Sequence, residues 1–340
     1  GKSTGRAYHG CMLRTCAYVV VFALAPVGAL AQHTLYAAET ISGSLGGNTS
    51  QYGGLQRYDF ASSGAAPTTG SGVPASSLSD PVGLHREGGN LYVINRHGNT
   101  TGQGSVQEFL WDGSSLSGGS TIATASSSSY QGFHGADFAP NGDLYVATLS
   151  AGVRRYRDSG SGLVDIGGVS SGSVRDVWVS PDGGKLIQSA TNGTLVVTDI
   201  QENGFGSTTA FTVSGAGAMH QMQFFGGSLY VTSFTSSTVH KVDLDGSFAP
   251  TSSSVLLNYS GAIGLAFSPD GHDLYVSSHT GNTIGRYQDQ SGSWVFLGDI
   301  STGHNMGYLE TVPEPGTLAA LALGALGIAR RRRKNSHSSD

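Results

Sequence analysis

A repeated unit restricts the folds open to this chain more than any other sequence feature. Each copy contains an apolar strand, a turn with Gly, a strand beginning with Leu-Tyr or a close variant, and a third strand. The copies cover residues 33–59, 82–98, 134–157, 174–199, 222–243 and 263–288, the first of them partial. Their anchor leucines are Leu35, Leu91, Leu144, Leu186, Leu229 and Leu274, spaced by 56, 53, 42, 43 and 45 residues.

The chemistry of the unit predicts stacked sheets. In Leu-Tyr-Val, Leu and Val share one face of a strand because successive side chains alternate. The SPDG and PNGD turns supply Pro for a fixed φ and Gly for a positive φ, so each joins two strands in a tight hairpin. One unit cannot bury its own apolar face. Periods in the forties with three or four strands therefore predict an all-β fold, the β-propeller.

The chain ends determine the number of blades. The first copy lacks its leading strand, and a lone strand-like segment, MGYLETV, remains at 306–312. The simplest solution is a six-bladed ring in which this segment completes the first blade and protects its edge. Seven blades stay open if 60–80 hides further strands. The longer early spacings otherwise predict Gly/Ser/Thr-rich loops at 60–80 and 97–105.

Two copies also point to known families. FSPDGHDLYVSS (267–278) and FAPNGDLYVAT (138–148) resemble the NHL, SMP-30/gluconolactonase-like and YVTN-type propellers. The resemblance covers most of residues 32–312 and implies the fold. These motifs mark a blade hairpin and not an activity, because related propellers include binding scaffolds as well as lactonases and lyases.

The C-terminus has the composition of a membrane stop. Residues 317–329 are apolar apart from Thr and Gly, and a block of basic residues follows at 330–334. As a helix this run spans roughly 20 Å against a hydrocarbon core of about 30 Å, so it suits a thin or transient span. The basic block would remain cytoplasmic. The alternative is a buried C-terminal helix with a basic tail.

This tail resembles the PEP-CTERM sorting signal of exopolysaccharide-producing Gram-negative bacteria. The residues that carry the resemblance are Pro313, Glu314, Pro315, Arg330, Arg331, Arg332 and Arg333. The resemblance implies that an exosortase recognises the tail and removes it near the triplet, after transient insertion of 317–329 in the inner membrane. It also implies a final location at the cell surface, in the outer membrane or in the extracellular matrix.

The N-terminus agrees with export. Residues 12–31 contain the basic Arg14, an apolar run and the small-x-small sequence Ala29-Leu30-Ala31, as in a secretory signal peptide cleaved by signal peptidase before Gln32. Met12 is a candidate initiator, with 1–11 as upstream residues.

The predicted organisation follows from these two ends. Residues 1–31 form the leader, 32–312 the propeller, 313–334 the sorting segment and 335–340 a polar tail. Both cysteines, Cys11 and Cys16, fall in the leader, so the mature body has no disulfide.

Processing also changes the charge. The leader and the basic block hold eight of the 18 Lys and Arg, and only one of the 23 Asp and Glu lies outside the mature body. The mature chain then carries 10 basic and 22 acidic residues, a net charge near −12. This excludes nucleic acid as an expected partner.

Polar residues at the starts of the leading strands are the candidate site, because these strands usually line the central channel. They are His134, Asp137, Arg175, Asp176, His220 and His304. His134, His220 and His304 are candidate ligands for a metal such as Zn²⁺, or one of them could act as general base on a lactone or ester. Otherwise they form hydrogen bonds within a wet channel. No cofactor is predicted, with Ca²⁺ or Zn²⁺ as alternatives.

Three functions fit these observations. The first is an exported, non-catalytic binding or scaffold protein for polysaccharide or a surface protein. The second is a lactonase- or lyase-like enzyme with its site at the channel mouth. The third is a structural surface-layer component.

Overall fold

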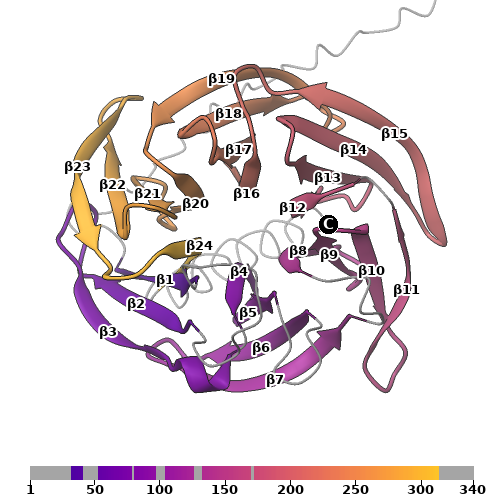
Figure 1. Ribbon diagram of the computed structural model, residues 1–340, viewed down its shortest axis with the longest axis horizontal. Coiled ribbons are helices and arrows are strands. Elements are labelled where there is room, and N and C mark those ends of the chain that lie inside the picture. The colour runs from indigo at the N-terminus through magenta and orange to yellow at the C-terminus, as the bar shows by residue number, and fades with distance from the viewer. Residues whose placement is uncertain are drawn as a thin grey trace, which may run out of the picture.

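The computed structural model describes residues 32–40, 53–78, 80–96, 104–125, 132–169 and 172–313. These residues form twenty-four strands in six four-stranded antiparallel sheets, with one short 3-10 helix, η1 (Ala75–Ser77). The six sheets are arranged as blades around a common axis (Figure 1). Within these residues, no helix is long and apolar enough to cross a membrane.

The four strands of each blade are hydrogen-bonded in order from the axis outward. Blade 1 consists of β24 (Met306–Pro313), β1 (His33–Glu39), β2 (Leu55–Phe60) and β3 (Thr68–Val73). Blade 2 consists of β4 (Pro81–Glu87), β5 (Asn90–Asn95), β6 (Ser105–Trp111) and β7 (Leu116–Thr124). Blade 3 consists of β8 (Phe133–Phe138), β9 (Leu144–Thr148), β10 (Gly152–Asp158) and β11 (Leu163–Val169). Blade 4 consists of β12 (Val174–Val179), β13 (Lys185–Ala190), β14 (Thr194–Gln201) and β15 (Gly204–Thr212). Blade 5 consists of β16 (Met219–Phe225), β17 (Ser228–Ser233), β18 (Thr238–Leu244) and β19 (Pro250–Asn258). Blade 6 consists of β20 (Ala262–Phe267), β21 (Asp273–Ser278), β22 (Thr283–Asp289) and β23 (Trp294–Ser301).

The two ends of the body share blade 1, which confirms the predicted closure and the six-bladed ring. β24 pairs with β1 so that Pro313 lies opposite His33 and Glu310 opposite Tyr36. The ring is closed by hydrogen bonds in one blade, and β1 has no open edge because β2 pairs with its other side.

The anchor leucines are confirmed as the centres of the blades. All six lie in the second strand of a blade, namely β1, β5, β9, β13, β17 and β21, and all are fully buried. The neighbouring Tyr145 and Tyr275, whose side chains point to the opposite face of the strand, are also buried. The blades therefore bury both faces of these strands, and not only the one apolar face that the pattern predicted. A blade is covered by neighbouring blades on both faces, and therefore both sets of alternating side chains are buried.

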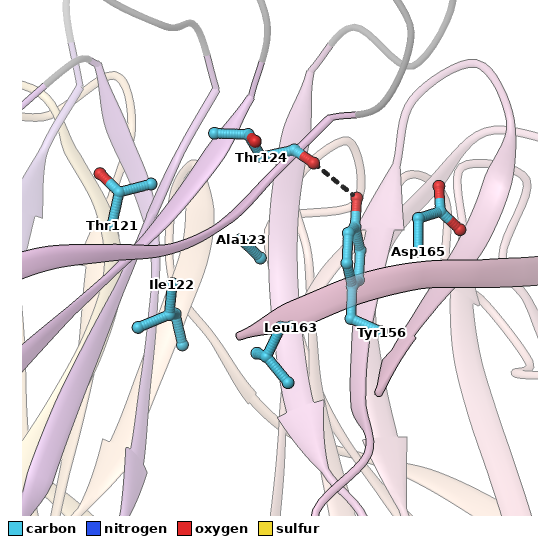
Figure 2. Close-up of a pocket in the computed structure, with 7 residues that line it drawn as sticks. All are labelled: Thr121, Ile122, Ala123, Thr124, Tyr156, Leu163 and Asp165. Atoms are coloured by element: carbon cyan, nitrogen blue, oxygen red, sulfur yellow. Dashed lines mark hydrogen bonds between the residues drawn. The ribbon is translucent and has the colours of Figure 1, made fainter. Parts of the chain in front are cut away.

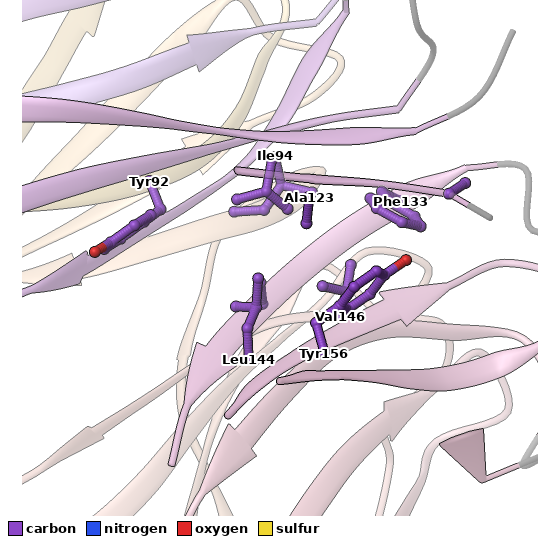
Figure 3. Packing of buried hydrophobic residues seen from close by; sticks show 10 residues of the cluster. Tyr92, Ile94, Ala123, Phe133, Leu144, Val146 and Tyr156 are labelled. Carbon is purple, nitrogen blue, oxygen red and sulfur yellow. The ribbon is translucent and has the colours of Figure 1, made fainter. Parts of the chain in front are cut away.

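The hydrophobic core lies between blades. One cluster joins Tyr92 and Ile94 of blade 2 to Phe133, Leu144 and Tyr156 of blade 3 (Figure 3). Because each interface is built from two successive units, one unit alone could not bury its apolar side chains.

The predicted loop at 60–80 is wrong in part, because β3 occupies Thr68–Val73. Its sequence, TTGSGV, lacks apolar alternation, and its residues are exposed or half-buried. The outermost strand of a blade faces water, so little in its sequence marks it as a strand. Of the second predicted loop, 97–103 lies outside the described residues and β6 begins at Ser105.

Candidate functional site

The leading strands β24, β4, β8, β12, β16 and β20 form an inner ring in which each contacts the next. His134, Arg175 and His220 are each the second residue of their strand, in three consecutive blades. The matching residues in the other blades are Val82, Ile263 and Gly307. One half of the ring is therefore polar at this level, and the other half is apolar.

Arg175 and His134 are in direct contact. Arg175 Nη1 lies 3.0 Å from His134 Nε2. A guanidinium can only donate, so His134 Nε2 accepts and the ring is the neutral tautomer with its proton on Nδ1. Arg175 Nε is buried, and no described residue forms a hydrogen bond with it. Tyr308 comes from β24 on the opposite side of the ring and donates its hydroxyl to the Arg175 carbonyl at 2.9 Å.

His220 is buried beside this pair. Its Nδ1 has no hydrogen-bond partner within the described part of the chain, and its ring packs edge-on against Phe234 at 6.0 Å. Burial lowers the pKa of His220 well below its usual range, and the charges of Arg175, His279 and Arg96 lower it further. His220 is therefore a neutral imidazole at neutral pH.

The reasoning from sequence missed Arg96 and His279. Each lies five residues after an anchor leucine, in LYVINR and LYVSSH, directly after β5 and β21. Neither lies on a leading strand, but their common position after the anchor leucines is a signal that marks both. Arg96 is paired with Asp80 at 2.8 Å, and His279 Nδ1 lies 3.2 Å from Thr40 Oγ1. We call Arg175, His220, His279 and Phe234 the axial site.

Asp137 and Asp176 act as clamps between blades. Asp137 accepts the backbone N–H of Phe138 at 2.8 Å and of Val179, in the next blade, at 2.7 Å. Asp176 similarly accepts from Val177 at 2.9 Å and from Met222, in the blade after it, at 2.6 Å. Burial raises the pKa of Asp137 to about 7 and that of Asp176 well above its usual range. Gln221 continues this pattern, because its Oε1 accepts from Leu265 and Leu309 N–H, each at 2.9 Å.

The structure does not bring His134, His220 and His304 together as a metal site. His304 is exposed in the bend between β23 and β24. No group of three His, Cys, Asp or Glu side chains in the described part of the chain could hold a metal ion. His85, another histidine of the inner ring, lies with its Nε2 3.3 Å from Asp137 Oδ1.

A depression between β7 and β11 offers a second candidate, with a volume of about 230 Å³ (Figure 2). Its polar groups already have partners within the protein. The Tyr156 hydroxyl donates to the Thr124 carbonyl at 3.2 Å, and Asp165 accepts from Arg154 at 2.6 Å and 3.1 Å. It therefore offers a ligand little beyond a small surface hollow.

The sequence also matches a described protein-sorting motif. Residues 311–334 match the PEP-CTERM protein-sorting motif. The chain carries this motif. It marks an exported protein that transits the membrane in Gram-negative bacteria and is sorted by an exosortase. No curated protein matches the chain by sequence.

Similar solved structures support the fold. The periplasmic gluconolactonase PpgL of Pseudomonas aeruginosa aligns with a TM-score of 0.58 and 17% identity over 84% of this chain and 100% of its own. A Bacteroides fragilis protein provisionally named a 6-phosphogluconolactonase aligns with a TM-score of 0.60 and 13% identity, over 85% of this chain and 100% of its own. A chain of a nidogen–laminin complex aligns with a TM-score of 0.57 and 10% identity, over 82% of this chain and 98% of its own. At these identities the likeness extends to the fold alone.

The PEP-CTERM motif begins inside the propeller. Thr311, Val312 and Pro313 are buried in β24, and Pro313 pairs with His33. Trp111 Nε1 donates to the Pro313 carbonyl at 3.3 Å. The rest of the motif, from Glu314 through Arg330–Arg333, and the predicted leader at 1–31 lie outside the described residues. The fold and the motif therefore share the residues before Glu314.

Replacing Glu310 with Gln should change how stability depends on pH. Burial raises the Glu310 pKa to about 7, while Arg86 lowers it by a smaller amount. The folded state then binds a proton that the unfolded state releases between about pH 4.5 and 7, so this stabilisation is present below that window and lost as pH rises through it. We expect Glu310→Gln to become more stable relative to the parent by about 1–3 kcal/mol across the window. Urea unfolding at pH 4.5, 6 and 8 measures this, and a constant difference would contradict it.

Proposed function

We propose that this protein is an exported β-propeller that binds a ligand at the axial site without converting it. In this proposal, signal peptidase removes residues 1–31 and an exosortase processes the PEP-CTERM tail after transient membrane insertion of 317–329. The mature protein then acts at the cell surface or in the exopolysaccharide matrix, where its partner is a polysaccharide or another surface protein.

One observation carries the non-catalytic part of the proposal. Asp137 and Asp176 lie on the same leading strands as His134 and Arg175, and each uses both carboxylate oxygens to hold backbone N–H groups, one of them in the next blade. Both carboxylates therefore have a structural role at the contacts between blades, which supports a binding site over a catalytic one. The remaining groups are nitrogen donors and neutral imidazoles, which suit recognition.

A lactonase is the second candidate. The structural neighbours include a gluconolactonase and a protein provisionally named a 6-phosphogluconolactonase. The neutral His220 imidazole, with a buried Nδ1 that has no partner, could accept a proton from water. A nidogen–laminin chain of the same fold supports the proposed binding function instead.

Hydrolysis of glucono-1,5-lactone and of its 6-phosphate by the full chain separates the two candidates. We expect no acceleration over buffer and expect co-sedimentation with insoluble bacterial exopolysaccharide. Lactone hydrolysis that is lost in His220→Ala but retained in His304→Ala would overturn the binding proposal. His304 is the matched control because it is exposed and lies outside the axial site.

A further inference from the structure

Arg175 differs from most arginines of the propeller in its charge balance. In the described part of the chain, carboxylates lie within 4.0 Å of Arg57, Arg86, Arg96, Arg154, Arg155 and Arg157, but not of Arg175. Its hydrogen bond goes to the neutral His134, and burial lowers its pKa. An arginine held in a partly buried position without an acid is costly unless something outside the protein balances it.

Two buried nitrogens in neighbouring blades point to that missing group. Among the described residues, neither Arg175 Nε nor His220 Nδ1 has a hydrogen-bond partner. An unsatisfied buried donor costs about 1–3 kcal/mol, and native proteins retain few of them. With the His220 proton on Nδ1, one acceptor between β12 and β16 would satisfy both nitrogens. The Arg175 side chain is partly exposed although its Nε is buried, so a ligand can approach the guanidinium from solvent.

The charge of the site selects the kind of acceptor. Arg96 is neutralised by Asp80, and the pKa values of His220 and His279 are lowered, first by burial. One positive charge, that of Arg175, therefore remains to be balanced at neutral pH. A monoanion matches one charge, and a carboxylate also matches the planar fork of a guanidinium.

Phe234 adds a second contact surface. Its half-buried ring lies edge-on to His220 at 6.0 Å and to His279 at 5.8 Å. A flat apolar ring beside His220 fits a pyranose whose acid group reaches Arg175. We propose that the axial site binds the carboxylate of an acidic sugar, with Arg175 and His220 holding the acid and Phe234 contacting the ring. This inference rests on the proposed binding function.

Titration calorimetry of the full chain tests the inference, with glucuronate, glucose and glucose 6-phosphate as probes. Glucuronate should bind, and Arg175→Met should weaken that binding about tenfold or more. Arg286→Met is the matched control, because Arg286 also has no carboxylate partner among the described residues but donates to the Ala65 carbonyl away from the axial site. Its affinity should equal that of the parent.

The other outcomes are also decisive. If Arg175→Met fails to show the parent's cooperative thermal transition, Arg175→Lys and Phe234→Ala replace it, and each should still weaken binding. Equal affinity for glucuronate and glucose would overturn the carboxylate assignment but leave the binding function intact. Tighter binding of glucose 6-phosphate than of glucuronate would assign the site to phosphate. No binding of the probes or of exopolysaccharide would overturn both proposals.

Discussion

Ending the chain at Asn305 is expected to abolish cooperative folding of the propeller. This truncation removes β24, which is the leading strand of blade 1 and buries Met306, Tyr308, Leu309 and Val312. Burial of each such side chain contributes about 1.5–3 kcal/mol, so together they approach the about 5–15 kcal/mol of a typical domain. The truncation also leaves β1 with an unpaired edge.

Ending the chain at Pro313 instead should leave folding unchanged, because β24 is then complete. The two chains differ by eight residues, so they form a matched pair. Urea unfolding followed by circular dichroism distinguishes them, with a single sharp transition expected only for the longer chain. Equal transition midpoints would show that β24 does not close the ring.

Replacing Asp143 with Ala is expected to destabilise the propeller by about 3–5 kcal/mol. Arg155 is 2% exposed and donates to Asp143 Oδ2 from Nε at 2.7 Å and from Nη2 at 2.5 Å. Arg157 donates to the same carboxylate at 2.8 Å and 2.9 Å. Arg155 also donates to the Gln201 carbonyl in blade 4, so the substitution leaves a buried cation unpaired at a contact between blades.

Asp199→Ala is the control for this substitution. Its ion pair with Lys185 lies at the surface, so we expect a loss below about 1 kcal/mol. Guanidinium chloride unfolding of the two variants measures both effects, and similar losses would contradict a buried-pair role for Asp143.

The same ion pair has a predicted pH dependence. Burial alone would raise the pKa of Asp143, but Arg157 and Arg155 outweigh it and lower the pKa to about 2. The contribution of Asp143 is therefore fully present above about pH 4 and is lost only as pH falls toward 2.

The blades could be predicted from sequence because one position in each carries strong physical constraints. Leu35, Leu144 and Leu274 are fully buried in second strands, so each copy must keep a large apolar residue there. The closing segment was also recognisable, since a strand-like run at 306–312 had no partner within its own unit. The outer strands such as β3 were missed because water covers much of their surface.

The axial site could be predicted only in part. Its Arg175 and His220, and the neighbouring His134, were found because they occupy one strand position in successive units. The clamping role of Asp137 could not be inferred, because its partner, the Val179 N–H, is 42 residues away in another blade. A backbone N–H does not depend on the type of side chain, so the residue type at position 179 does not reveal this contact.

Mass spectrometry of the mature protein isolated from its native host most directly tests the central claim that processing removes the sorting signal just after the last strand of the propeller. The account predicts an N-terminus at Gln32 and a C-terminus at or just after Pro313, with β24 complete. A mature chain that ends before Met306, or that keeps Arg330–Lys334, would contradict it.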